Sequence, residues 1–294
     1  MKQEIIKYFS QCIYEQLYNC EQSFFNNIEE IRIRVNKPLI VKSLGSEIII
    51  NKNFCPSIKD MKETIQLMSE FSLYSYEDEI KNGYITLPDG HRVGLCGKVV
   101  IENEKVKTIS HISAINVRFS HEIKGCADGI LKHAKGSVLI ISPPGCGKTT
   151  LLRDIVRQVS DGGQTVGIVD ERSEIAASYL GVPQNDVGMR TDVLDSCRKS
   201  LGIMMLLRSM SPDIIAVDEI GRQEDVIAIE EALTSGVKLF CTVHGSSIQN
   251  ILEKPHLAEL IKRKIFDTYI ILGYGEKPGE IKQVLNKNMK EVDI

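Results

Sequence analysis

The chain has 294 residues, with 36 Lys and Arg against 39 Asp and Glu, so its formal net charge is −3. A hydrophobic content of 43% with 26% charged residues is typical of a globular protein, and it excludes a disordered or collagen-like chain. The near balance of charge argues against a strongly basic nucleic-acid binder. No apolar run reaches the ~20 residues that span a bilayer, and charges interrupt the start where a signal peptide is apolar. We therefore expect a cytoplasmic protein of one large or two ordinary domains.

The eight cysteines are scattered along the chain, and no two of them have the C-x-x-C spacing of zinc and redox sites. In a cytoplasmic protein the expected state is a set of reduced, mostly buried thiols.

Residues 1–124 predict a mixed α+β domain. Apolar residues recur with helical spacing over 5–17 and 59–71. Short apolar or alternating runs separated by turn residues predict strands. The expected strands lie at 31–35, 39–41, 48–50, 84–86, 92–95 and 115–118.

Beyond a glycine-containing linker at 125–129, strands alternate with helices, as a parallel sheet requires. We therefore predict a second domain over 125–294, of α/β class with a mostly parallel sheet. Its last strands, at 269–272 and 284–285, form a closing hairpin with Pro278 and Gly279 as the turn.

A phosphate-binding loop is predicted where the apolar strand 137–141 meets the sequence SPPGCGKTT at 142–150 and a helix. Small glycines let backbone N–H groups approach phosphate oxygens, and the helix start adds partial positive charge. Lys148 is expected to bridge the β- and γ-phosphates, and the Thr149 hydroxyl to bind Mg²⁺. The strict motif begins with Gly, whereas this loop begins with Ser142. The expected nucleotide-binding residues are Pro144, Gly145, Cys146, Gly147, Lys148, Thr149 and Thr150.

An acidic strand end lies about seventy residues further on. The apolar run 213–217 leads into Asp218 and Glu219. A P-loop enzyme needs an acid at such a strand end to order the Mg²⁺ shell, and Asp218 fits this need. Glu219 is placed to act as general base on the attacking water.

Two further strand ends carry polar residues. The strand 237–244 ends in Thr242 and His244, and we expect it beside the P-loop strand, with His244 near the γ-phosphate. The strand 165–169 ends in an acidic loop, where Glu171 or Glu174 can hold water or the metal shell, or can form ion pairs of the loop itself. Arg208 precedes the acidic strand, and its role stays open between phosphate and an acid.

Together these motifs resemble the type II and type IV secretion ATPase superfamily of RecA-like P-loop proteins, with its P-loop, acidic box, strand ending in Glu, and Thr-x-His. A closer resemblance is to the stage III sporulation protein AA family. It rests on the acidic box 169–176, the segments 188–195 and 208–212, and the N-terminal stretches 29–35 and 87–94. Arg198 stands where that family's pattern suggests Pro.

This resemblance implies an ATP- and Mg²⁺-dependent ATPase on the mother-cell side during endospore formation, docked on the membrane through channel proteins. It also implies a hexameric ring, in which an arginine of the N-terminal domain completes the nucleotide site. Arg118 and, less directly, Arg92 are the candidates, although an exposed strand arginine also pairs readily with a neighbouring acid.

Two rival functions remain open from the sequence. A nucleic-acid-linked P-loop ATPase, such as a loader or translocase, is compatible with Arg32, Arg34 and the basic cluster 262–264, but the net charge and the absence of Trp argue against it. A small-molecule kinase is disfavoured because Glu219 beside Asp218 favours activation of water.

Overall fold

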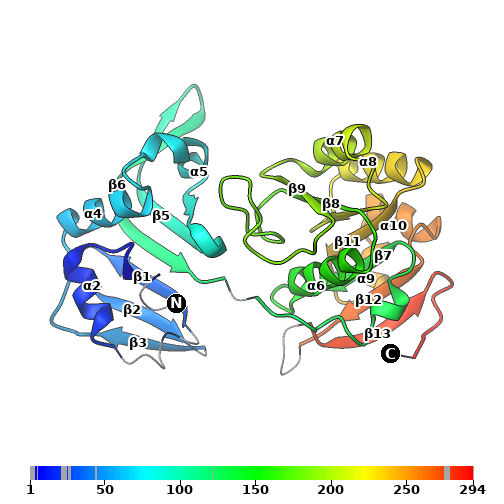
Figure 1. Ribbon diagram of the computed structural model, residues 1–294, viewed down its shortest axis with the longest axis horizontal. Helices are drawn as coiled ribbons and strands as arrows, with labels where there is room; N and C mark the ends of the chain where they lie inside the picture. The colour runs from blue at the N-terminus through cyan, green and yellow to red at the C-terminus, as the bar shows by residue number, and fades with distance from the viewer. Residues whose placement is uncertain are drawn as a thin grey trace. The chain divides into compact units, whose positions relative to one another are not determined.

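The computed structural model describes residues 4, 6–20, 25, 28–43, 45–120, 122–274 and 279–293. The chain divides into two compact units, Met1–His121 and Glu122–Ile294 (Figure 1). Each unit has its own sheet. The sequence places the boundary after residue 124, inside the same connecting segment.

The N-terminal unit is built on a six-stranded antiparallel sheet of order β3-β2-β1-β6-β5-β4. Its strands are β1 (Ile28–Arg34), β2 (Lys37–Ser43), β3 (Ser46–Ile50), β4 (Tyr84–Thr86), β5 (Arg92–Glu102) and β6 (Lys105–Arg118). Its helices are α2 (Gln11–Tyr18), α4 (Ile58–Met68), α5 (Glu77–Lys81) and the short 3₁₀ turns η1 (Leu73–Tyr76) and η2 (Pro88–Gly90).

Alternation along the strands gives this sheet one apolar and one polar face. Ile31 and Ile33 of β1 are fully buried, whereas Arg32 between them is partly exposed. The apolar sides of α2 and α4 pack with the apolar face, and α4 begins where Ser57 and Asp60 form a reciprocal capping box.

The β5–β6 hairpin is much longer than its predicted strands 92–95 and 115–118, and it projects from the sheet (Figure 1). Its tip is the two-residue turn of Asn103 and Glu104, which have φ of +51° and +60°. Both values fit the turn type that matches the twist of a tight hairpin. The hairpin beyond residue 95 contains the short apolar run 99–101, although its side chains are largely exposed on both faces.

The C-terminal unit contains a seven-stranded sheet of order β13-β12-β7-β11-β10-β8-β9, parallel except for β13. Its strands are β7 (Val138–Ser142), β8 (Val166–Asp170), β9 (Thr191–Asp195), β10 (Ile214–Val217), β11 (Lys238–His244), β12 (Thr268–Leu272) and β13 (Ile281–Asn286). Its helices are η3 (Leu131–His133), α6 (Lys148–Asp161), α7 (Lys199–Ser209), α8 (Gln223–Thr234), α9 (Ile248–Leu252) and α10 (Pro255–Lys262). The predicted α/β fold with a mostly parallel sheet is confirmed.

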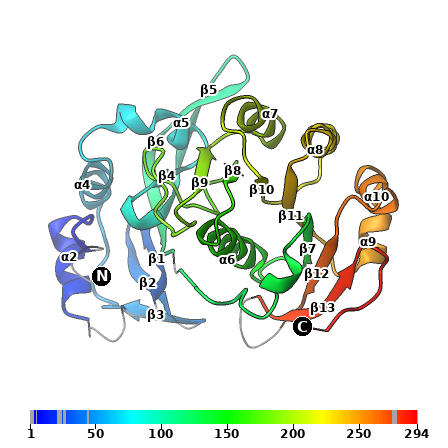
Figure 2. The same cartoon turned by 45° about the vertical axis from the view of Figure 1, so that its right-hand side comes forward.

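Two cores sandwich this sheet, because successive side chains of its strands point to opposite faces. Leu139 and Ile141 of β7 pack with α7, α8, α9 and α10, whereas Val138 and Ile140 pack with α6 (Figure 2). The strands are buried on both faces, so they are fixed in place, and their carboxyl ends form a rigid edge that positions loops.

Several details differ from the sequence-based expectations. The helix predicted over 5–17 is interrupted: residue 5 lies outside the described residues, Ile6 is helical, a turn follows at 7–9, and α2 begins at Gln11. Strand β9 was not predicted. Of the eight free cysteines only Cys146 and Cys241 are buried, so the prediction of mostly buried thiols is wrong. Pro278 of the predicted hairpin turn lies outside the described residues, although β12 and β13 do pair antiparallel. Within the described ranges, no helix combines the length and apolarity needed to cross a bilayer.

Candidate active site

The P-loop connects β7 to α6 and contains two glycines in the left-handed region. Gly145 and Gly147 have φ of +76° and +84°, which residues with a Cβ rarely adopt. Gly147 is the N-cap of α6, and no side chain caps the first turn of this helix. The amides of this turn have no partner within the helix and remain available to an anion. Lys148 and Thr149 are the first two residues of α6.

Two threonines, one on helix α6 and one on strand β11, donate hydrogen bonds to the carboxylate of Asp218. Thr149 Oγ1 donates to Asp218 Oδ2 at 2.6 Å, and Thr242 Oγ1 donates to Asp218 Oδ1. The Thr242 hydroxyl also accepts the backbone N–H of Glu219 at 2.8 Å. Strand β11 lies beside β7, as predicted, and pairs on its other side with β10, so Thr242 stands between the P-loop and the acidic strand end.

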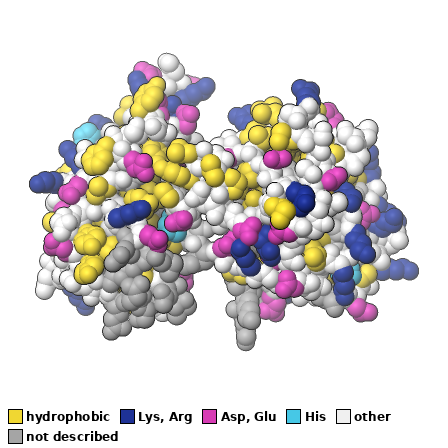
Figure 3. All heavy atoms as spheres, viewed as in Figure 1, with side chains coloured by type: hydrophobic (Ala, Val, Ile, Leu, Met, Phe, Trp, Pro, Cys, Tyr) yellow, Lys and Arg dark blue, Asp and Glu magenta, His cyan; other side chains and the backbone are white. Residues whose placement is uncertain are grey.

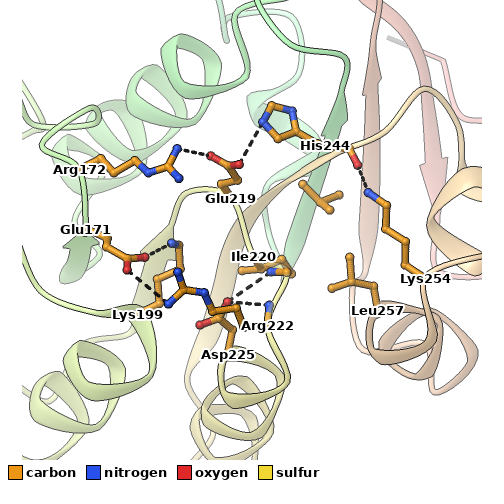
Figure 4. A pocket seen from close by; sticks show the side chains of 12 residues that line it. Glu171, Arg172, Lys199, Glu219, Ile220, Arg222, Asp225, His244, Lys254 and Leu257 are labelled. Atoms are coloured by element: carbon orange, nitrogen blue, oxygen red, sulfur yellow. Dashed lines mark hydrogen bonds and ion pairs between the residues drawn. The ribbon is translucent and has the colours of Figure 1, made fainter. Parts of the chain in front are cut away.

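Glu219 is held between two cationic or polar side chains (Figure 4). Its Oε2 accepts a hydrogen bond from Arg172 Nη1 at 3.1 Å, and its Oε1 lies 3.2 Å from His244 Nε2. Its backbone has φ of +55°, an uncommon conformation for a residue with a side chain. His244 Nδ1 is buried and has no hydrogen-bond partner among the described residues.

A pocket of about 330 Å³ opens beside Glu219 and His244. Figure 4 shows Arg172, Lys199, Arg222 and Lys254 around it, from four different segments. Three of these cations have carboxylate partners, whereas Lys254 donates to the backbone carbonyl of His244 at 2.5 Å. The pocket is therefore a part of the same edge of the sheet where most of the cationic side chains are paired with Glu171 or Glu219.

The acidic box after β8 divides into residues with separate contacts. Asp170 is buried and accepts the backbone N–H groups of Glu174, Ile175 and Ala176 at 2.8–2.9 Å. Burial raises the pKa of Asp170 to about 6, against the effect of these hydrogen bonds. Its contacts are those of a residue that shapes the loop.

The sequence left two roles open for Glu171, at the metal or water site or in an ion pair of the loop, and in the structure Glu171 forms an ion pair. It binds Lys199 and lies 3.9 Å from Arg222 Nη1. Burial alone would raise its pKa, but the hydrogen bond and charge of Lys199 outweigh burial and lower it. The Glu174 side chain is exposed, and its carbonyl accepts from Arg153.

The N-terminal arginines also have partners inside their own unit. Arg118 Nε donates to Glu30 at 3.2 Å, and Arg92 lies over the Tyr84 ring at 3.9 Å from its centroid. Arg208, on α7, is exposed.

Sequence reasoning assigned no role to Arg172 or Lys199, and none to the hydroxyl of Thr242. Thr242 was detectable in principle, because it lies two residues before His244 on one strand and so shares its face. Arg172 and Lys199 carried no such signal, because their partners lie 47 and 28 residues away in the chain.

The residues fit the cofactors that a P-loop implies. Uncapped amides on two positive-φ glycines suit a triphosphate, and the hydroxyl and carboxylate oxygens of Thr149 and Asp218 suit Mg²⁺. Over the part of the chain that is described, no cluster of three His, Cys, Asp or Glu side chains forms a separate metal site.

Solved structures share this fold. The Legionella pneumophila ATPase DotB superposes with a TM-score of 0.59 at 17% identity, over 90% of this chain and 78% of that one. The pilus retraction motor PilT with bound ADP gives 0.58 at 18% identity, over 85% and 75%. The C-terminal unit thus has a RecA-like fold, preceded by a smaller antiparallel-sheet domain.

The family follows from the sequence comparisons. The family model described as "Sporulation stage III, protein AA" matches residues 1–292. The stage III sporulation protein AA of Bacillus subtilis strain 168 is 39% identical over 294 aligned positions, covering 97% of this chain and 95% of that protein. The chain belongs to the sporulation stage III protein AA family.

Proposed function

We propose that this protein is an Mg²⁺-dependent ATPase that powers or assembles a membrane channel complex during endospore formation. The observation that carries the proposal is the 2.6 Å contact from Thr149 of the P-loop to Asp218 of the acidic strand, with Glu219 beside it. A triphosphate on the P-loop amides would place its terminal phosphate near this pair. Bound Mg²⁺ would neutralise charge on the β- and γ-phosphates.

In this proposal, Lys148 contacts the β- and γ-phosphates and Glu219 accepts the proton of the attacking water. Glu219 has one partner on each carboxylate oxygen, Arg172 and His244, and each oxygen keeps a further lone pair that can accept from water. His244 would contact the γ-phosphate once it leaves Glu219. We assign Glu171 to holding Lys199 rather than to the metal shell, since its carboxylate is already paired.

The cellular setting is proposed from the named relatives. We infer that six copies of the chain form a ring, as the family resemblance implies. The ring would lie on the mother-cell side of the membranes and bind channel proteins there. An arginine of the N-terminal unit, Arg118 or Arg92, would complete the site, which requires Arg118 to leave Glu30.

Replacing the general base tests the proposal. Glu219→Gln keeps the size and polarity of the side chain but cannot accept the water proton. We expect phosphate release to fall about 10²–10⁴-fold while ATP binding persists. Phosphate release and retention of labelled ATP measure the two effects.

Lys148→Ala is the complementary control, since it should lose nucleotide retention itself. Turnover of Glu219→Gln at the wild-type rate would refute the assignment. Stimulation by single-stranded DNA that falls steeply with salt would instead favour the nucleic-acid-linked ATPase.

A further inference from the structure

A largely apolar groove of about 570 Å³ lies within the N-terminal unit, between α4, η1 and residues 108–113 of β6. Ile58 on its wall is 61% exposed and Leu73 is 47% exposed. Figure 3 shows hydrophobic side chains at the surface of this unit among the charged ones. Large apolar side chains gathered around a hollow mark an interaction site.

The groove runs along an unpaired strand edge. Strand β1 pairs with β6 only between Ala114 and Arg118, whereas β5 pairs with β6 up to Lys105. Residues 108–110, which line the groove, pair with β5 and therefore have a strand neighbour on one side only within the described sheet; His111, with φ of +48°, marks an irregularity next to them. Such an edge offers N–H and C=O groups to an extended segment, which can add as a new strand.

The charged residues that line the groove indicate what charge its occupant should carry. Its ionisable lining residues are Lys62 and His111, and no carboxylate lines it. Lys62 is exposed and has no ion-pair partner in the described part of the chain. The groove thus suits an extended apolar segment that carries one carboxylate.

Strand β3 is a segment of this kind. It forms the other edge of the same sheet, and among the described strands it pairs with β2 alone (Figure 1). Ile48 and Ile49 are 43% and 47% exposed. Glu47 is exposed and, among the residues described, has no ion-pair partner. Strand alternation puts Glu47 and Ile49 on the same side.

We propose that β3 of one copy of this chain adds to the open β6 edge of a second copy, with Glu47 against Lys62 and Ile49 against the apolar wall at Ile58. Donor strand and acceptor groove are different surfaces, so the contact is head-to-tail and can close into a ring. The inference rests on the proposed self-association but not on ATP hydrolysis, which is measured separately.

Charge reversal tests the contact in the full chain. Lys62→Glu and Glu47→Lys should each weaken self-association at least about tenfold, because each juxtaposes like charges. The double variant, and an equimolar mixture of the two single variants, should recover it because every contact is again between opposite charges. Sedimentation across a concentration series measures the association constant, and circular dichroism checks folding.

Lys59→Glu is the matched control, since it makes the same charge change on α4 at an exposed position outside the groove. A labelled peptide of residues 45–51 supplies a second readout. It should bind the wild-type chain saturably and should bind Lys62→Glu at least about tenfold more weakly.

Three results would overturn the proposal. They are a wild-type chain that stays monomeric at every concentration, single variants that associate as wild type does, and a peptide indifferent to Lys62→Glu. Because Glu219→Gln leaves these surfaces intact, loss of ATPase activity with unchanged association would count against neither the groove nor β3.

Discussion

At the scale of single residues, the hydroxyl of Thr242 connects the two acids of the site. It donates to Asp218 and accepts from the backbone of Glu219, so one atom orients both the proposed metal ligand and the proposed general base. Groups that hold a metal ligand in this way typically contribute 10–100-fold to metal affinity or activity. We regard Thr242 as a positioning residue.

Thr242→Val removes the hydroxyl and keeps the shape of the side chain. We expect the Mg²⁺ concentration for half-maximal ATPase activity to rise about 10–100-fold, with ATP retention less affected. Thr242→Ser keeps both hydrogen bonds and should stay close to wild type. Equal Mg²⁺ dependence of the Val and Ser variants would contradict the role. Phosphate release measured over a series of Mg²⁺ concentrations gives the concentration for half-maximal activity of each variant.

Glu219 illustrates a residue whose conformation is decided by its surroundings. A positive φ in a residue with a Cβ costs about 1–3 kcal/mol and persists only when neighbouring contacts hold it. Here its N–H binds Thr242 and its carboxylate lies between Arg172 and His244. The acid after β10 was visible in the sequence, but this orientation was not.

At the scale of elements, the loop after β8 is organised by one buried carboxyl. Three successive N–H groups converge on Asp170, and the carbonyls of Glu174 and Ile175 bind Arg153 of α6. The loop is thereby joined to the helix that begins at the P-loop. Its shape is fixed by contacts between elements rather than by its own acidic composition.

The stability of this arrangement should depend on pH. The pKa of Asp170 is raised from 3.8 to about 6, so the folded state binds its proton more tightly than the unfolded state does. The contribution of Asp170 to the free energy of unfolding is therefore most unfavourable above pH 6 and improves as pH falls toward 4. Between pH 7 and pH 5 the gain is about 1 kcal/mol.

Comparison with Asp170→Asn isolates this effect. Asn does not titrate, and the pH dependence that all other groups contribute is the same in both proteins and cancels in the difference. The wild-type free energy of unfolding, minus that of the variant, should increase from pH 7 to pH 5. Denaturant unfolding at both pH values measures it. A difference that shrinks on acidification would contradict the raised pKa.

At the scale of the whole molecule, the chain consists of two units with separate sheets. Only the C-terminal unit carries the P-loop and the acidic strand end. A ligand that binds the folded form alone stabilises it by about 2.7 kcal/mol at a hundred times its Kd. For a unit of this size that corresponds to a Tm increase of about 5–10 °C.

ATP with Mg²⁺ should therefore raise the melting transition of the unit that contains the P-loop, and Lys148→Ala should abolish the increase. Calorimetry of Glu219→Gln, which cannot consume the ATP, measures the shift. Unchanged melting of this variant at millimolar nucleotide would contradict nucleotide binding at the P-loop.

The sequence by itself determined the fold class, most strands and the family. The reason is that a buried parallel strand is a continuous apolar run, and a phosphate loop needs glycines and Lys-Thr at fixed spacing. It also placed β11 beside β7, and the structure confirms this pairing. These signals lie within short stretches of the chain, so they can be recognised from the sequence alone.

The tertiary structure alone decided which side chains meet. Glu171 pairs with Lys199, Glu219 with Arg172, and Arg118 with Glu30, across 28, 47 and 88 positions of the chain. The open edge of β6 likewise depends on where β1 ends beside it. Composition and periodicity carry no information on such distant pairs, because the chain reversals that bring them together are set by packing of whole elements.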